Sequence, residues 1–235
     1  MTADDRRYSV PLYSAAEAAR YLEVPPSTFR IWVHGYGRRT AGARTQPAGG
    51  PIVTSFAPKD GAIIPFVGFA EAFVLTALRR SGVPLQRIRP ALDFLQRELG
   101  LEHALASKRL FTDGAEVLYD YAERQAGAVE ARALELVVAR SGQGVFTEIV
   151  QSYLKRIEFA DDDRANLIHL PQYRGADVVV DPERSFGAPI FAHGGNRIED
   201  VIATFKAGEE LDTLVEEFGV PRPELLDVLR VNVAA

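Results

Sequence analysis

The chain has 235 residues, of which 47% are hydrophobic and 25% charged, proportions typical of a globular protein. It has no cysteine, which excludes disulfides and thiolate metal sites. Its four histidines lack metal-ligand spacing such as H-x-x-x-H, so no metal or cofactor is expected. The start has no apolar signal-peptide core, and no apolar run approaches the roughly 20 residues that span a bilayer. We therefore expect a cytoplasmic protein without a membrane partner.

The net charge of −5 is distributed unevenly along the chain. Residues 1–100 carry 13 basic and 8 acidic side chains, a net charge of +5, whereas residues 101–235 carry 14 and 24, a net charge of −10. A basic front and an acidic rear indicate two partners with different surfaces. The alternative is chance composition with a solvated acidic face.

Residues 13–34 have the layout of two helices joined by a tight turn. Ser14 and Glu17 form the S-x-x-E capping box of a helix start, and Pro25 and Pro26 stop that helix because proline lacks an amide donor. A second helix starts at Ser27. We expect its inward face to hold Phe29, Ile31, Trp32 and Val33, and its outward face Thr28, Arg30 and His34. A second helix displayed in this way suits the major groove of DNA; an ordinary helical hairpin in a core is the alternative.

Residues 34–62 are rich in glycine, proline, threonine and arginine. Two short β-like segments, residues 52–56 and 62–65, are joined through a sequence that contains Asp60-Gly61, a strong turn signal. We interpret this region as a wing: a hairpin preceded by a flexible basic loop. That loop carries Arg38, Arg39 and Arg44. Arginines there suit phosphate or minor-groove contacts, and solvated arginines without a function are the alternative.

The middle of the chain alternates helical and strand-like patterns. Apolar spacing predicts helices over residues 66–81 and 85–99. The second helix has a leucine-rich apolar stripe, which could pack in the core of the monomer or form a dimer contact. Further helices are predicted over residues 112–126 and 146–156, the latter with Ile149, Val150, Tyr153 and Leu154 inside. Short strands are predicted at residues 134–139, 157–159 and 166–170.

The last 60 residues read as a separate unit. A β-branched strand, Val178–Val180, precedes three short helices over residues 197–207, 209–218 and 224–231, the first with Asn196 as its cap. Residues 176–235 hold 5 basic and 12 acidic side chains, and this net charge of −7 favours a protein partner over phosphate.

The front of the chain resembles MerR-type winged-helix DNA-binding domains from about residue 13 to residue 100. From Tyr13 to Arg30 it reads Y-S-x-x-E-A-A-x-x-L-x-V-x-x-S-T-x-R, and a G-V-x-L junction follows at Gly82. The resemblance implies that Arg30 meets the DNA backbone and that the wing adds phosphate contacts. The wing loop is longer than in that family, and the long antiparallel coiled coil that ends most such regulators is not evident.

The end of the chain resembles a small helical domain of unknown function that is common in VapB-type antitoxins. The matching residues are Asp181-Pro182, the run from Gly187 to Phe191, and Gly195-Asn196-Arg197-Ile198, where asparagine replaces the family's threonine. This resemblance implies that a PIN-like ribonuclease toxin is the partner. It also makes Arg197 the candidate toxin contact, because an arginine can fork onto the metal-binding carboxylates of such a nuclease. A structural role, in which Arg197 bonds local carbonyls, is the alternative.

These features predict a mainly α (α+β) protein with three domains. A winged helix-turn-helix covers residues 8–100, a mixed helix and strand region covers 101–175, and a three-helix domain covers 176–235. We expect the antitoxin of a type II toxin-antitoxin pair, which binds double-stranded operator DNA as a homodimeric autorepressor and neutralises the toxin through its C-terminal half. The candidate DNA contacts are Ser27, Thr28, Arg30, His34, Arg38, Arg39 and Arg44.

A second hypothesis is a MerR-like transcriptional regulator that senses a small molecule in its middle region. Its pocket would be lined by Tyr119, Tyr121, Phe146 and Tyr153, although aromatic side chains at helical spacing more often belong to a core. An enzyme is not expected, because the sequence has no Ser-His-Asp set, P-loop, G-x-G-x-x-G motif or metal cluster.

Overall fold

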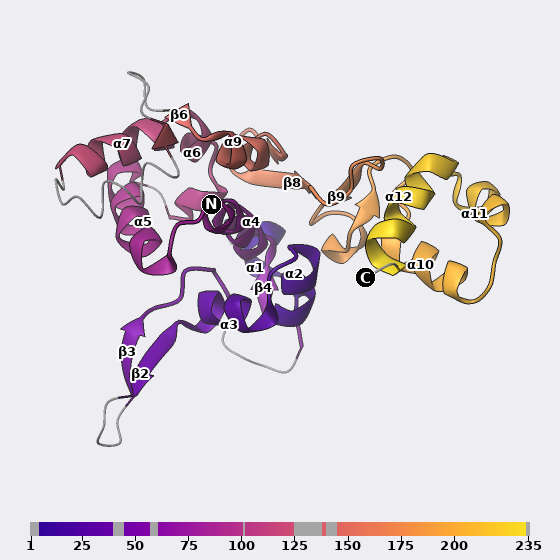
Figure 1. Ribbon diagram of the computed structural model, residues 1–235, viewed down its shortest axis with the longest axis horizontal. Helices are drawn as coiled ribbons and strands as arrows, with labels where there is room; N and C mark the ends of the chain where they lie inside the picture. Colours follow the sequence, from indigo (N-terminus) through magenta and orange to yellow (C-terminus); the bar gives the residue numbers. More distant parts are fainter. Residues whose placement is uncertain are drawn as a thin grey trace. The chain divides into compact units, whose positions relative to one another are not determined.

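The structure, a computed structural model, describes residues 5–39, 45–56, 61–100, 102–124, 138–139 and 145–233. It is a helix-rich protein with small sheets (Figure 1). The chain divides into two compact units, one of residues 1–155 with 159–165, and one of residues 156–158 with 166–235. The division into three domains at residues 100 and 175 stays a prediction. Within the described ranges, no helix is both long and apolar enough to cross a bilayer.

The first unit begins with α1 (Arg6–Ser9), β1 (Pro11–Tyr13), α2 (Ala15–Tyr21) and α3 (Pro26–His34). The predicted capping box of α2 is present: the Glu17 amide donates to Ser14 Oγ at 3.2 Å, and the Ser14 amide donates to Glu17 Oε2 at 2.8 Å. The helix α3 starts at Pro26, one residue earlier than predicted, with Pro25 as its N-cap. Proline fits the first turn because the amides there have no helical acceptor.

The strand pairing of the predicted wing is wrong. The hairpin is formed by β2 (Tyr36–Arg39) and β3 (Thr45–Gly49), within the segment that we expected to be a loop, and it extends away from the helices of its unit (Figure 1). The strand β4 (Ile64–Pro65) pairs with β1 instead of with residues 52–56, which form no strand. The predicted turn covers residues 58–61, of which residues 58–60 lie outside the described residues.

Two long helices form the core of the first unit. Every residue of α4 (Phe66–Arg80) from Phe66 to Leu78 is buried, so this helix is covered on all sides. The helix α5 (Leu85–Leu99) buries Ile88, Leu95 and Leu99. Its predicted apolar stripe therefore packs within the unit, and dimerisation does not follow from it.

The rest of the first unit consists of short elements. They are η1 (Ala104–Ala106), α6 (Lys108–Thr112), α7 (Gly114–Arg124), β5 (Val138–Ala139), β6 (Val145–Phe146) and α9 (Glu148–Leu154). In α9, Val150, Tyr153 and Leu154 are buried as predicted, but Ile149 is 45% exposed. The expectation that Ile149 points inward is wrong, because it lies one helical position outside the buried stripe.

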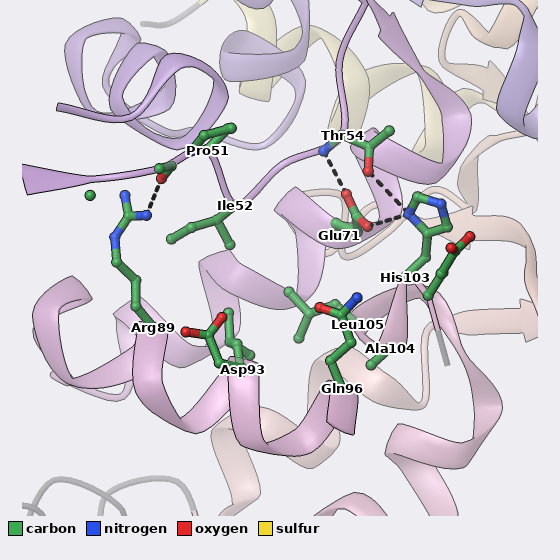
Figure 2. A pocket seen from close by; sticks show the side chains of 14 residues that line it. Pro51, Ile52, Thr54, Glu71, Arg89, Asp93, Gln96, His103, Ala104 and Leu105 are labelled. Atoms are coloured by element: carbon green, nitrogen blue, oxygen red, sulfur yellow. Dashed lines mark hydrogen bonds and ion pairs between the residues drawn. The ribbon is translucent and has the colours of Figure 1, made fainter. Parts of the chain in front are cut away.

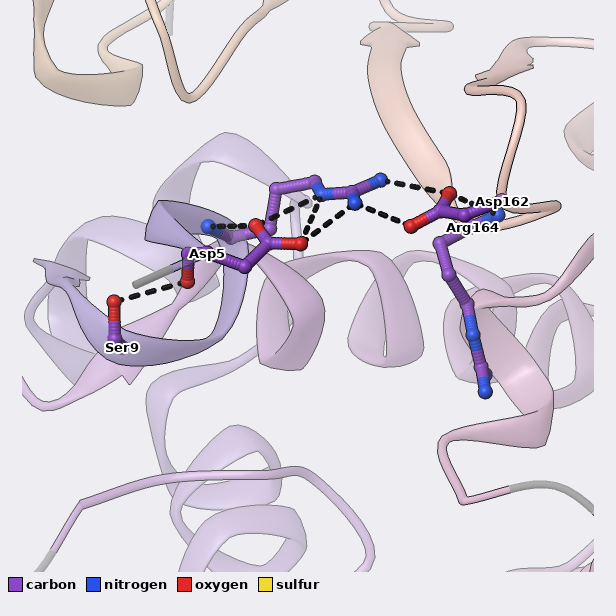
Figure 3. Close-up of polar contacts among 5 residues, drawn as sticks. Asp5, Ser9, Asp162 and Arg164 are labelled. Atoms are coloured by element: carbon purple, nitrogen blue, oxygen red, sulfur yellow. Dashed lines mark hydrogen bonds and ion pairs between the residues drawn. The ribbon is translucent and has the colours of Figure 1, made fainter. Parts of the chain in front are cut away.

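The N-terminal helix is fastened to the polar turn at residues 160–165 by one arginine. The Arg7 guanidinium donates to both carboxylate oxygens of Asp5 and to Oδ1 of Asp162 at 3.1 Å (Figure 3). The hydrogen bonds from Arg7 outweigh partial burial and lower the pKa of both Asp5 and Asp162. One carboxylate of the Asp161–Asp163 turn is thus committed to an ion pair.

A four-stranded sheet and three helices follow. The strands are β7 (Ile157–Phe159), β8 (Ala165–His169), β9 (Val178–Val180) and β10 (Ile190–Phe191), in the order β10-β9-β8-β7. The helices are α10 (Ile198–Lys206), α11 (Leu211–Phe218) and α12 (Arg222–Val233), and η2 (Ser185–Gly187) precedes β10. Asn196 does not cap α10: its Nδ2 donates to the Phe218 carbonyl at 2.6 Å, and Arg197 is the N-cap residue.

The buried carboxylate of Asp227 joins α12 to the loop before β9. It accepts hydrogen bonds from the amides of Gly175 at 2.7 Å and Ala176 at 3.1 Å. Burial alone would raise the pKa of Asp227, but these backbone donors reverse the direction and lower it. The carboxylate is therefore held ionised inside the second unit.

Candidate nucleic-acid interface

The helix α3 has one buried and one exposed face. Phe29, Trp32 and Val33 are at most 2% exposed, as predicted. Ile31 is 38% exposed, so its predicted inward position is wrong. The exposed face carries Ser27, Arg30 and His34 beside Ile31, and Thr28 is half-buried at its edge. Two hydrogen-bonding groups and one permanent cation are thus presented along a single side of α3.

The predicted arginines of the wing are only partly within the described residues. Arg38 and Arg39 belong to β2, where they pair in register with Gln46 and Thr45 of β3. Both arginines therefore lie on the first strand of the hairpin that follows α3 in the chain. Arg44 lies outside the described residues.

The segment after the hairpin, residues 49–54, is anchored to α3 by its backbone. We call it the linking segment. The amides of Ile52 and Val53 both donate to the Trp32 carbonyl, at 2.8 and 3.1 Å. Gly35 lies against the start of the segment: a Cβ there would come within 2.2 Å of the Gly49 carbonyl oxygen, and its φ of +73° suits glycine. The base of the hairpin is thus fixed directly to the C-terminal end of α3.

The far end of the linking segment is anchored to α4. The Thr54 amide donates to Glu71 Oε2 at 2.7 Å, and a Cβ on Gly68 would approach the Thr54 carbonyl oxygen to 2.1 Å. Only a glycine lets the helix and the segment approach so closely. One signal in the sequence could have indicated this contact, namely the acidic Glu71 inside the apolar run of residues 66–78.

Glu71 is the centre of a small buried network. Its side chain is only 5% exposed, and its Oε1 lies 2.8 Å from Nδ1 of His103, which also lies 3.1 Å from Thr54 Oγ1 (Figure 2). Arg89 of α5 donates to the Gly50 carbonyl at the other end of the linking segment. A buried carboxylate is tolerated where its oxygens are hydrogen-bonded. Three elements, α4, α5 and the residues before η1, therefore hold the segment that carries the hairpin.

Comparisons with known proteins agree with this architecture. Residues 11–92 match the family described as "Putative DNA-binding HTH domain". The chain is 50% identical over 229 residues to "Putative antitoxin VapB45" of Mycobacterium tuberculosis, covering 95% of this chain and 94% of that protein. The chain belongs to the VapB45 family. It is also 26% identical over 225 residues to the uncharacterized protein Rv2308 of the same organism, covering 93% of this chain and 88% of that one.

A solved member of the same fold is the crystal structure of Rv2018 from Mycobacterium tuberculosis. It has 45% sequence identity and a TM-score of 0.84, covering 95% of this chain and 99% of that one. In this VapB45 relative, the residues 11–92 that match the helix-turn-helix family contain α2, α3 and α4. That match extends through the hairpin, the linking segment and most of α5.

In the second unit of this VapB45 relative, two exposed side chains stand out. The Arg197 guanidinium is exposed, and its Nη2 lies 3.3 Å from Glu199 Oε2, a surface pair of small energetic weight. Phe186 is 79% exposed, and it and Ser185 have left-handed φ angles of 52° and 46°. Left-handed backbone is costly for residues other than glycine. A large aromatic side chain is thus held in solvent on strained backbone.

Among the residues that the structure describes, no group of three or more histidine, cysteine, aspartate or glutamate side chains is arranged to hold a metal ion. His169 comes nearest to a charged cluster, with Nδ1 at 2.7 Å from Asp177 and Nε2 at 2.9 Å from Glu158. Partial burial lowers the pKa of His169, but these two carboxylates outweigh burial and the net direction is upward. The cluster is therefore a pH-dependent ion pair within the sheet.

Proposed function

We propose that this protein is the antitoxin of a type II toxin-antitoxin pair and represses its own operator. The observation that carries the DNA-binding half is the exposed face of α3, tied through Trp32 to the base of the β2–β3 hairpin, within residues that match a helix-turn-helix family. The antitoxin half is supported by 50% identity to a protein named as an antitoxin. Both activities are binding functions, so no catalytic residue is proposed.

On DNA, α3 would occupy the major groove and the hairpin would act as the wing. Ser27, Thr28 and His34 would contact bases or phosphates, and Arg30 would pair with a phosphate. The hairpin would bring Arg38 and Arg39, with Arg44 between its strands in the sequence, to the adjacent backbone or minor groove. The excess of positive charge in residues 1–100 supports this orientation, because phosphate neutralisation supplies most nonspecific affinity. A homodimer would bind two half-sites of a palindrome.

The second unit would hold a PIN-like ribonuclease toxin in the cytoplasm. Its net negative charge complements a nucleic-acid-binding partner, which must itself attract phosphates. Arg197 is available for the toxin's metal-binding carboxylates, because its exposed pair with Glu199 is easily exchanged. We add Phe186, since an exposed aromatic side chain on strained backbone is a typical anchor of a protein interface.

Full-length variants test the toxin half of this proposal. Arg197→Ala should weaken toxin binding about tenfold or more, the usual effect of losing a charged hydrogen bond, whereas Arg174→Ala, a second exposed arginine of this unit, should not. Phe186→Gly removes the ring and relieves the left-handed strain, so it should weaken toxin binding while keeping or raising thermal stability. Toxin affinity that is unchanged in both variants would contradict the proposed surface.

The small-molecule regulator with a pocket among middle-region aromatics is less well supported. Tyr121, Phe146 and Tyr153 are buried. Their rings pack against neighbours, with Tyr121 4.7 Å from Phe94 and Tyr153 4.9 Å from Phe73 between ring centroids. The side chain of Tyr119 lies outside the described residues. These aromatic residues form core contacts.

A further inference from the structure

A polar cavity of about 630 Å³ lies beneath the linking segment in the first unit. Its walls come from residues 49–54, from Glu71 of α4, from α5 and from residues 102–105. In Figure 2, Arg89, Asp93 and Gln96 rise from α5 on one side, and Thr54, Glu71 and His103 lie on the other. A volume of this size is typical of small-ligand sites.

The charges of the lining residues favour a cation. Three carboxylates line the cavity, those of Glu71, Asp93 and Glu102, against one guanidinium, that of Arg89. Arg89 already donates to the Gly50 carbonyl, and Glu71 already accepts from Thr54 and His103. Asp93 and Glu102 are both exposed. A bound cation would therefore meet two solvent-accessible carboxylates in a cavity whose net charge is negative.

The cavity also adjoins backbone that is held in an unfavourable conformation. His103, on its wall, has a left-handed backbone with φ of 57° and ψ of 43°. Its ring is fixed on one side by Glu71 and packs against Tyr8, with 5.4 Å between ring centroids. Strained residues of this kind concentrate at ligand sites and switches.

We propose that this cavity binds a small organic amine, which its acidic residues recognise, and that occupancy changes the affinity of the protein for DNA. The amine would pair with Asp93 and Glu102. Both contacts that fasten the linking segment, Arg89 to Gly50 and Glu71 to Thr54, involve lining residues. A ligand that shifts either contact would act on the linking segment, whose backbone joins the base of the hairpin to the C-terminal end of α3. The change in the free energy of DNA binding equals the difference in the ligand's binding free energy between the DNA-free and the DNA-bound arrangement of the segment.

The coupling to DNA rests on the proposed operator binding, but the amine site does not, so the two are tested separately. The first experiment titrates putrescine into the full-length protein and follows the ring resonances of His103 by NMR, with butanediol as the uncharged ligand of equal length. Putrescine should shift the resonances saturably and butanediol should not. Asp93→Asn and Glu102→Gln should each weaken putrescine binding about tenfold, whereas Glu98→Gln, an exposed residue of α5 that does not line the cavity, should leave it unchanged.

An absence of saturable binding, or equal weakening by Glu98→Gln, overturns the site. The second experiment measures operator affinity with and without putrescine, in the wild type and in Asp93→Asn. A response in the wild type that Asp93→Asn removes supports the coupling and excludes a direct effect of the amine on DNA. An identical response in both proteins overturns the coupling. If no operator is bound at all, the proposed function fails while the binding titration still decides the amine site.

Discussion

Replacing Glu71 with alanine should loosen the linking segment and lower operator affinity. The substitution removes the acceptor of the Thr54 amide at 2.7 Å and of His103 Nδ1 at 2.8 Å, in a side chain that is only 5% exposed. Each of these hydrogen bonds to a charged acceptor contributes about 1.5–3 kcal/mol. Removing the desolvation cost of a buried carboxylate offsets part of this loss, so the net local cost is about 2–4 kcal/mol.

The most direct assay is amide hydrogen exchange at Thr54. If the amide exchanges through local opening, the lost free energy corresponds to an acceleration of roughly 30- to 1,000-fold. Operator affinity, measured in parallel, should fall because the hairpin loses one of its two side-chain fastenings. Glu71→Gln keeps one acceptor oxygen, so its Thr54 exchange rate should lie between those of the wild type and the alanine variant. The glutamine variant also replaces the alanine variant in this test if alanine prevents folding.

The matched control is Glu98→Ala, which removes an exposed glutamate of the neighbouring helix α5. It should change neither Thr54 exchange nor operator affinity. If Thr54 exchanges equally fast in the folded wild type and in Glu71→Ala, the carboxylate does not hold the segment and our reasoning about the hairpin base is refuted.

Three further outcomes follow from particular contacts. Gly68→Ala places a methyl group 2.1 Å from the Thr54 carbonyl oxygen. Overpacking of this kind costs about 1–3 kcal/mol, so the melting temperature should fall by roughly 2–12 °C. An unchanged melting temperature would contradict the close approach. His169 has a raised pKa, so its stabilising contribution is complete below its unfolded pKa of about 6.5 and is lost as pH rises through the folded pKa. In denaturant titrations, His169→Gln should therefore reduce the loss of unfolding free energy as pH rises through this range. If the loss is the same in the variant, another group causes it. Asp227→Ala leaves the Gly175 and Ala176 amides unpaired and should cost about 2–4 kcal/mol of unfolding free energy, whereas a loss below about 0.5 kcal/mol would show that the carboxylate is dispensable.

The sequence predicts best where the determinants are local. The Ser14–Glu17 capping box and the proline pair each act on an adjacent helical turn, so the start of α2 and the turn before α3 follow from nearby residues. The strand Val178–Val180 follows in the same way from β-branched residues in succession.

The β2–β3 hairpin was misplaced because its strands are poor in β-forming residues. Residues 36–39 and 45–49 contain two glycines, a proline and two arginines, a composition that indicates a loop. Their pairing depends instead on tertiary anchorage of the linking segment to Trp32 and Glu71. Propensity arguments do not include contacts of this kind.

The cavity and its network could not be predicted from the sequence for a related reason. Thr54 and Glu71 are separated by 17 residues, and Glu71 and His103 by 32, with no periodic pattern connecting them. Asn196 shows the same limit at shorter range: as a local cap it suits α10, but the Phe218 carbonyl offers its amide a hydrogen bond in the folded protein.

Operator binding by the exposed face of α3 is the central claim, and a salt-dependent titration of Arg30→Ala tests it most directly. The full-length wild type, Arg30→Ala and Arg97→Ala, an exposed arginine of α5, are each titrated with DNA from upstream of the protein's own reading frame over a range of salt concentrations. Arg30→Ala should weaken binding about tenfold at low salt and reduce the slope of log affinity against log salt by about one, while Arg97→Ala should match the wild type. If Arg30→Ala and the wild type give superimposable titrations, α3 does not contact the DNA.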